Sequence, residues 1–161
     1  MRSLALLLVT AFVLAGCGGS TVTVSTTTNA TGPPGPGTTL YAGGDWAVVL
    51  DGDHATAFHR VAGTWNADTS GAVRIRILGP DGAVAATPQV AAELSAKQPL
   101  IESGMWVDGK ELVVKGGGLT ATKGTIYGAP GAPLTKGTHV AVAYARTAAH
   151  ATAVAWSFRV A

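Results

Sequence analysis

The chain has 161 residues, of which 47% are hydrophobic and only 12% are charged. This composition favours a compact fold over an intrinsically disordered chain. The 11 basic and 9 acidic side chains are scattered singly along the sequence, whereas nucleic-acid binding needs lysine and arginine clustered on one face, so we expect no nucleic-acid partner.

The N-terminal residues have the features of an export signal. Arg2 and the amino terminus supply a short positive region, and residues 4–14 form an apolar run that is too short to cross a membrane as a helix. The run ends in Leu14-Ala15-Gly16-Cys17, which resembles the bacterial lipobox, in which small residues precede a cysteine that is acylated and becomes the mature N-terminus. The resemblance implies a lipoprotein signal peptide over residues 1–16.

Cys17 is the only cysteine of the chain. Secreted proteins usually pair their cysteines, and lipidation of Cys17, with palmitate among the acyl groups, explains the unpaired thiol. Two or three acyl chains give stable attachment to a bilayer. We therefore predict a lipid-anchored protein on the extracytoplasmic side of the cell membrane, with the lipid bilayer as its partner through Cys17.

Residues 17–39 are predicted to be the lipidated cysteine followed by a disordered tether. From residue 18 onward this segment is almost wholly Gly, Ser, Thr, Pro and other small residues, with a Gly/Pro-rich stretch at 32–37. Such a composition cannot bury enough surface to fold. The folded domain is therefore expected to begin at residue 40.

Residues 40–161 are predicted to form one all-β domain, because short runs alternate with period two between Gly, Pro and Asp turns and no long segment has the period of an amphipathic helix. The Asp-Gly pairs suit tight turns. Residues 90–97 fit either a short helix or a strand, and we predict a strand. The other predicted strands cover 46–50, 55–60, 73–77, 105–107, 111–114, 138–146 and 152–160.

The last two of these strands are expected to form a C-terminal hairpin with a turn near Ala148-Ala149. Period-two alternation places Trp156 and Phe158 on the core face of the final strand. The same argument places Val140, Val142 and Tyr144 inward on its partner, and His59 and His139 on outward faces.

Three segments resemble bacterial immunoglobulin-like domains: Trp-Val-Asp-Gly at 106–109, Pro-Leu-Thr-Lys-Gly-Thr-His at 133–139 and Trp-Ser-Phe-Arg-Val at 156–160. The resemblance implies an immunoglobulin-like β-sandwich with a binding or structural role. The antibody subtype is excluded because it needs a cysteine pair around its core tryptophan.

His150 suggests an alternative function. Together with Trp156, Phe158 and Val160 it is similar to the closing segment of CopC-like copper-binding domains, in which a histidine at this place helps to bind cupric ion. The resemblance implies a copper or other metal site formed by His150 and a second histidine, because a useful site needs at least two convergent ligands. The candidates for the second ligand are His139, His54 and His59.

No motif in the chain indicates catalysis. The 51–53 turn lacks the further ligands of a calcium loop, and the glycines at 116–118 precede Lys123 in the wrong arrangement for a phosphate loop. The nine carboxylates are dispersed and provide no general acid and base pair. We therefore predict a non-enzymatic protein without a cofactor.

Trp65 is the candidate binding residue for a protein or glycan partner. Tryptophan is enriched at binding hot spots. Trp65 lies between turn residues in Gly63-Thr64-Trp65-Asn66 and is the tryptophan expected to be partly exposed.

Overall fold

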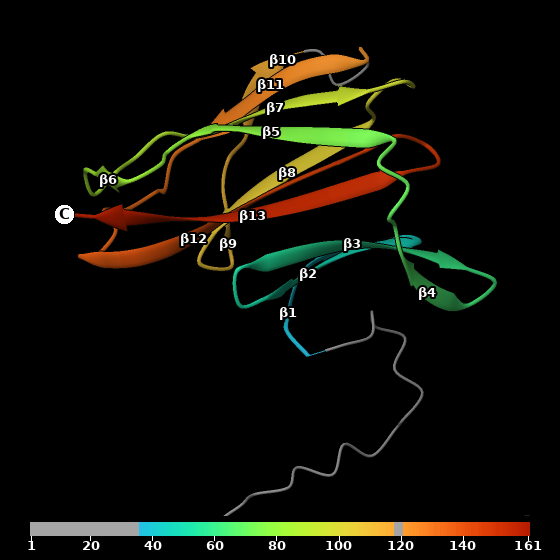
Figure 1. Cartoon of the computed structure of the whole chain (residues 1–161), viewed down its shortest axis with the longest axis horizontal. Coiled ribbons are helices and arrows are strands. Elements are labelled where there is room, and N and C mark those ends of the chain that lie inside the picture. The colour runs from blue at the N-terminus through green and yellow to red at the C-terminus, as the bar shows by residue number, and fades with distance from the viewer. Residues whose placement is uncertain (1–35, 118–120) are drawn as a thin grey trace, which may run out of the picture.

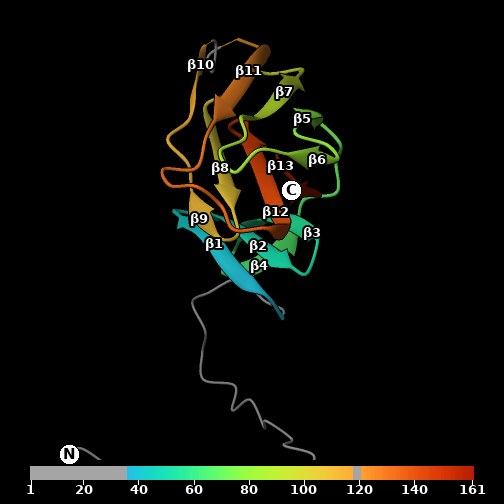
Figure 2. The same cartoon turned by 90° about the vertical axis from the view of Figure 1, so that its left-hand side faces the viewer.

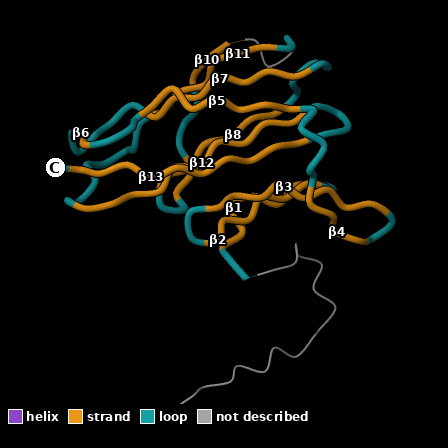
Figure 3. Tube along the Cα trace, in the orientation of Figure 1, coloured by secondary structure: helices purple, strands orange, loops and turns teal. Residues whose placement is uncertain are grey.

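A computed structural model describes residues 36–117 and 121–161, which form thirteen strands in three sheets (Figures 1 and 3). The predicted signal peptide, Cys17 and the tether up to residue 35 lie outside the described residues. Within the described part of the chain, no helix has the length and hydropathy that crossing a bilayer requires.

The first sheet is an antiparallel meander in the order β1-β2-β3-β4. Its strands are β1 (Thr38–Gly43), β2 (Trp46–Asp51), β3 (His54–Val61) and β4 (Thr64–Ala67). The predicted strands at 46–50 and 55–60 are confirmed and pair across a tight turn in which Gly52 has a φ of 61°. β1 begins two residues inside the segment predicted as tether.

The remaining strands form a two-sheet sandwich in which β10-β11-β7-β5 faces β6-β13-β12-β8-β9. This is the D-E-B-A sheet and the G-F-C sheet of the immunoglobulin fold, so the predicted all-β immunoglobulin-like β-sandwich is confirmed. Its strands are β5 (Val73–Gly79), β6 (Ala83–Val84), β7 (Val90–Ala96), β8 (Glu102–Val107), β9 (Lys110–Glu111), β10 (Lys115–Gly117), β11 (Lys123–Gly128), β12 (Gly137–Arg146) and β13 (Ala151–Val160).

The core between these two sheets is filled by alternate side chains of their strands. Leu94 and Ile126 come from one sheet, and Met105, Trp156 and Phe158 come from the other. The predicted core face of the last strand is therefore confirmed. The strand prediction for residues 90–97 is also confirmed, because β7 pairs with both β5 and β11.

β12 is buried on both of its faces. Its alanines at 141, 143 and 145 face the sandwich core, whereas Val142 and Tyr144 pack against the meander. The prediction that Val140, Val142 and Tyr144 face the sandwich core is wrong, because residues 38–67 form a separate sheet that covers the outer face. A continuous apolar run is the pattern of a strand buried on both sides.

Figure 2 shows the meander packed beside the sandwich. A second apolar cluster fills the junction between them. Trp106 lies in it beside Gly104, where a Cβ would stand 2.6 Å from the indole ring. Glycine at 104 is therefore required for this position of the indole. The buried members of the cluster are Trp46, Val48, Ala57, Trp106, Val142, Tyr144 and Ala151.

An ion pair within the sandwich, between Arg146 and Glu102, contacts the meander across the same junction. The Tyr41 hydroxyl donates to Glu102 Oε1 at 2.6 Å, and Arg146 Nε donates to the other oxygen of that carboxylate. The guanidinium of Arg146 also lies 5.5 Å from the centre of the Trp46 ring. Burial and the neighbouring Glu102 raise the pKa of Tyr41 to about 12, so the hydroxyl remains a donor.

Tyr41 and Tyr144 provide a matched pair of variants at this junction. The Tyr144 hydroxyl is buried without a hydrogen-bond partner among the described residues, so Tyr144→Phe removes an unsatisfied polar group. We expect this change to leave the free energy of unfolding unchanged or to raise it by about 1 kcal/mol. Tyr41→Phe should lower it by about 1.5 to 3 kcal/mol because it breaks a hydrogen bond to a charged group. Denaturant titration of both variants measures the difference, and a larger loss in Tyr144→Phe than in Tyr41→Phe would contradict this geometry.

Candidate binding site

Three segments of the chain meet at one end of the sandwich. They are the 68–72 linker between β4 and β5, the 97–101 loop between β7 and β8, and the 147–150 turn between β12 and β13. In immunoglobulin variable domains, the loops equivalent to the last two segments belong to the antigen-binding end. In this protein the same end is hollowed by a groove and by a cleft.

The 147–150 turn is held by the buried side chain of Thr147. Its Oγ1 accepts hydrogen bonds from the backbone N–H groups of Ala149 (3.3 Å) and His150 (3.1 Å). The same hydroxyl donates to the His150 carbonyl at 3.2 Å, and the Thr147 N–H donates to that carbonyl at 2.8 Å. These bonds fix the position at which the His150 side chain leaves the turn.

Asp68 ties the linker to the start of β13. Its carboxylate accepts hydrogen bonds from the backbone N–H of Ala151 (2.8 Å) and of Ser70 (2.9 Å), and His150 Nδ1 lies 3.4 Å from Oδ2. Burial acts to raise the pKa of Asp68, but the hydrogen bonds from Ser70 and Ala151 and the charge of His150 outweigh it and lower the pKa. The side chain is therefore an ionised carboxylate, and each of its two oxygens accepts one backbone N–H.

The groove, which we call the His150 groove, has a volume of about 510 Å³. The inner face of the β3–β4 hairpin forms one wall, the linker forms its floor, and the 147–150 turn forms the other wall. Imidazole, amide and hydroxyl groups alternate with small apolar side chains along it. Its lining residues are His59, Val61, Asn66, Ala67, Asp68, Thr69, Ser70, Ala149 and His150.

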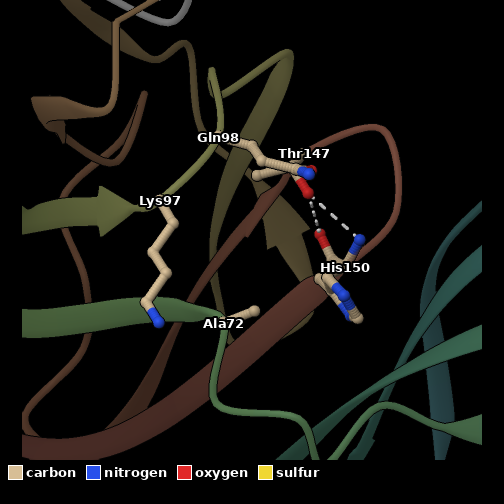
Figure 4. Close-up of a pocket in the computed structure, with 5 residues that line it drawn as sticks. All are labelled: Ala72, Lys97, Gln98, Thr147 and His150. Atoms are coloured by element: carbon tan, nitrogen blue, oxygen red, sulfur yellow. Dashed lines mark hydrogen bonds between the residues drawn. The ribbon is translucent and has the colours of Figure 1, made fainter.

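The cleft, which we call the Lys97 cleft, lies on the other side of His150. It consists of two adjoining hollows of about 160 and 280 Å³ that share Ala72 and Lys97. Figure 4 shows Lys97 on one side of the smaller hollow and Thr147 with His150 on the other. The larger hollow is bounded by Arg74 and Ser95.

His139 lies far from this end of the molecule. It is only 7% exposed and stacks against Phe158, so the prediction that it faces outward is wrong. The reason is again the second covered face of β12, which reverses the inward and outward sides. The strand register places His139 and His150 at opposite ends of the β12–β13 hairpin, roughly 25 Å apart at about 3.3 Å per residue. The two histidines cannot share one metal ion.

Both ring nitrogens of His139 already have partners. Nδ1 lies 2.6 Å from Asp108 Oδ2, and Nε2 lies 2.8 Å from the Thr135 carbonyl oxygen. Because both partners accept hydrogen bonds, both nitrogens must carry protons, and the ring is an imidazolium. The hydrogen bonds to Asp108 and to Thr135 raise the pKa of His139 against the opposing effect of burial.

Of the other histidines, His59 lines the His150 groove together with His150, whereas His54 does not. His59 stacks on Trp46 with ring centres 3.9 Å apart, and His54 lies beside Asp53 in the β2–β3 turn. Among residues 36–117 and 121–161, no group of three or more His, Cys, Asp and Glu side chains could hold a metal ion.

Trp65 lies outside both the groove and the cleft. The residue opposite it in the register is Arg60, whose guanidinium lies 5.3 Å from the indole centre. Trp65 is half-buried on the outer face of the meander. Cys17, the predicted lipidation site, lies outside the described residues.

Asp68, Lys97 and Thr147 are the residues of this end that sequence reasoning missed. Asp68 starts the polar run Asp-Thr-Ser-Gly at 68–71, which is a turn signal. That signal predicts a loop, and it contains no information on the partner segment 80 residues later in the chain. Only the three-dimensional packing brings these residues together.

Comparisons with known proteins give likenesses among solved structures only. No family model matches the chain, and no curated protein matches it. Among solved structures, the chain is similar to one protein chain in a crystal structure of the titin M10 and obscurin-like 1 immunoglobulin complex. The match has 15% identity and a TM-score of 0.35, and covers 55% of this chain and 95% of the other. The fold assignment rests on the strand order of the two sheets.

The His139 imidazolium predicts a pH dependence of stability. A histidine whose pKa is raised on folding stabilises the folded state, because it binds its proton more tightly there. This stability is fully present below the unfolded pKa of about 6.5 and is lost as the pH rises through the folded pKa. We therefore expect the free energy of unfolding to fall as the pH rises above about 6.5. His139→Gln should flatten this slope, whereas the exposed control His54→Gln should retain it. Denaturant titrations across this pH range test the assignment, which fails if the wild-type slope persists in His139→Gln.

Proposed function

We propose that the chain is a lipid-anchored, extracytoplasmic protein whose immunoglobulin-like domain is a non-catalytic binding module. The anchor is Cys17, on the strength of the lipobox-like motif that precedes it. The binding surface is the end of the sandwich that carries the His150 groove and the Lys97 cleft. The partner class is a soluble ligand or a protein or glycan outside the cell.

The observation that supports this proposal most is that the hollowed end lies away from the point where the chain enters the fold. β1 starts at Thr38, opposite Leu50 in the register. Further along β1, Leu40 Cδ2 lies 3.9 Å from the position of a Cβ at Gly109, in the β8–β9 turn. That turn is at the far end of the sandwich from the 147–150 turn. A tether attached at β1 therefore leaves the groove and the cleft open to ligands.

The chemistry of the groove supports binding in preference to catalysis. The Asp68 carboxylate is occupied by backbone N–H groups, and the Thr147 hydroxyl is used within its own turn. A general base or a nucleophile needs a free lone pair within reach of the substrate. These two groups instead hold the loops in place, so they are positioning residues.

The anchor is tested by Cys17→Ser. We expect mass spectrometry of the membrane-extracted wild-type protein to find acyl chains on an N-terminal Cys17. The variant should leave the membrane fraction, because removing the acylated thiol removes the attachment. Ser20→Ala, three residues further along, is the matched control and should remain in the membrane fraction. An unacylated Cys17 in the extracted protein would overturn the anchor.

The binding module is tested by a survey of small probes with the full mature protein in detergent micelles. Monosaccharides, amino acids, inorganic phosphate, citrate and cupric ion are added while amide chemical shifts are recorded. We expect at least one probe to shift amides within 66–72 and 147–151, and none to be turned over. Shifts confined to other surfaces, or measurable turnover, would contradict the proposal. Copper binding that depends on His150 and a second histidine would favour a metal-binding protein instead.

A further inference from the structure

Two cationic side chains, Arg74 and Lys97, line the Lys97 cleft, and a third, Lys123, lies on the next strand opposite Ser95. Arg74 and Lys123 both pair with Ser95 in the register, one from each side, so they flank it on the same face of the sheet. Lys97 follows Ser95 by two residues and lines the same cleft as Arg74 and Ser95. Cβ atoms of directly opposed residues are about 4.5 to 5.5 Å apart. Three neighbouring strands thus bring three positive charges around one hydroxyl.

None of these three cations has an ion-pair partner among the residues that the structure describes. The carboxylates nearest to them are already committed. Glu93 is bound by Arg76 at 2.6 Å, and Asp68 is hydrogen-bonded to backbone N–H groups and faces His150. Arg74 and Lys123 lie on either side of β7, and Lys97 is diagonal to both, so the three like charges stand roughly 7 to 10 Å apart. An anion bound between them would reduce their mutual repulsion.

We propose that the Lys97 cleft, with Arg74, Ser95, Lys97 and Lys123 around it, binds an oxyanion group, phosphate or carboxylate, of a soluble ligand. This inference deepens the binding function proposed above and rests on it. Arginine presents a planar fork that binds either group through two parallel hydrogen bonds, and lysine adds a point charge. The Ser95 hydroxyl supplies a neutral donor between them. The larger hollow, of about 280 Å³, has room for the anionic group and the atoms that carry it.

The position of the Lys97 cleft favours a soluble ligand over the lipid headgroups of the anchoring membrane. The chain enters the fold at the start of β1, beside the β2–β3 turn that carries Asp51 and Asp53. The Lys97 cleft lies at the other end of the sandwich, away from the anchor.

The test measures binding of three probes to the full mature protein by calorimetry: inorganic phosphate, citrate and vesicles that contain phosphatidylglycerol. Phosphate and citrate distinguish the two kinds of oxyanion. We expect one or both to bind, and the affinity to fall with added salt because partly exposed charges are screened. The double variant Arg74→Ala/Lys97→Ala should weaken binding by about a hundredfold, since each of the two lost charged hydrogen bonds contributes roughly tenfold.

The matched control is Lys110→Ala/Lys136→Ala, which removes the same net charge at the opposite end of the sandwich and should leave the affinity unchanged. The conservative variant Lys97→Arg should also retain binding. Thermal unfolding verifies that each variant is folded before its affinity is compared with that of the wild type. Equal losses in both double variants, or no binding of either oxyanion, would overturn the inference. Because the acyl chains attach the protein to any vesicle, vesicle binding counts against the inference only if it is weakened in Arg74→Ala/Lys97→Ala. If another probe shifts the amides of this end while oxyanions do not, the binding module stands and the oxyanion assignment falls.

Discussion

Burial of β12 on both faces is the constraint on which the rest of the molecule depends. Its alanines face the sandwich core, where Ala141 stands directly opposite Trp156 and leaves room for the indole. Its large side chains, such as Tyr144, therefore lie on the outer face together with Trp106. Leaving this surface in water would cost about 25 cal/mol for each Å² of apolar area. The meander covers it, and the three sheets form one packed structure.

This arrangement decides which surface remains for recognition. The outer face of the β8-β12-β13 sheet is taken by the chain's own N-terminal strands, so that face is closed to partners. The His150 groove, however, is created by the same docking, because one wall comes from the β3–β4 hairpin and the other from the 147–150 turn. Arg146, which joins Glu102 and Trp46 across the junction, is the residue immediately before that turn. The polar contact that holds the meander thus also fixes the groove.

The sandwich could be predicted from the sequence because its signals are local. Alternation in the last strand identifies Trp156 and Phe158 as core residues, and the turn glycines mark where strands pair. The third layer could not be predicted in this way. In the run from Val140 to Ala145 both sets of alternate residues are apolar, so period-two reasoning must choose one face, and it chose the larger side chains. The error in the position of His139 has the same origin, because the true inward set is the alanines.

The site shows why a single histidine is weak evidence for a metal centre. The resemblance around His150 concerns one hairpin, and a hairpin can present one imidazole in the right place without the other ligands. A metal site needs convergent free lone pairs. Here the neighbour of His150 is Asp68, whose oxygens accept the N–H groups of Ser70 and Ala151, and His139 uses both nitrogens at the far end of the same hairpin. Beside His150 lies the Asp68 carboxylate, which already accepts two backbone N–H groups. On the other side of His150, the cleft contains Lys97, which has no ion-pair partner among the described residues. Only the packing of the chain, and not the resemblance within one hairpin, shows that His59, Asp68 and Lys97 are the groups near His150.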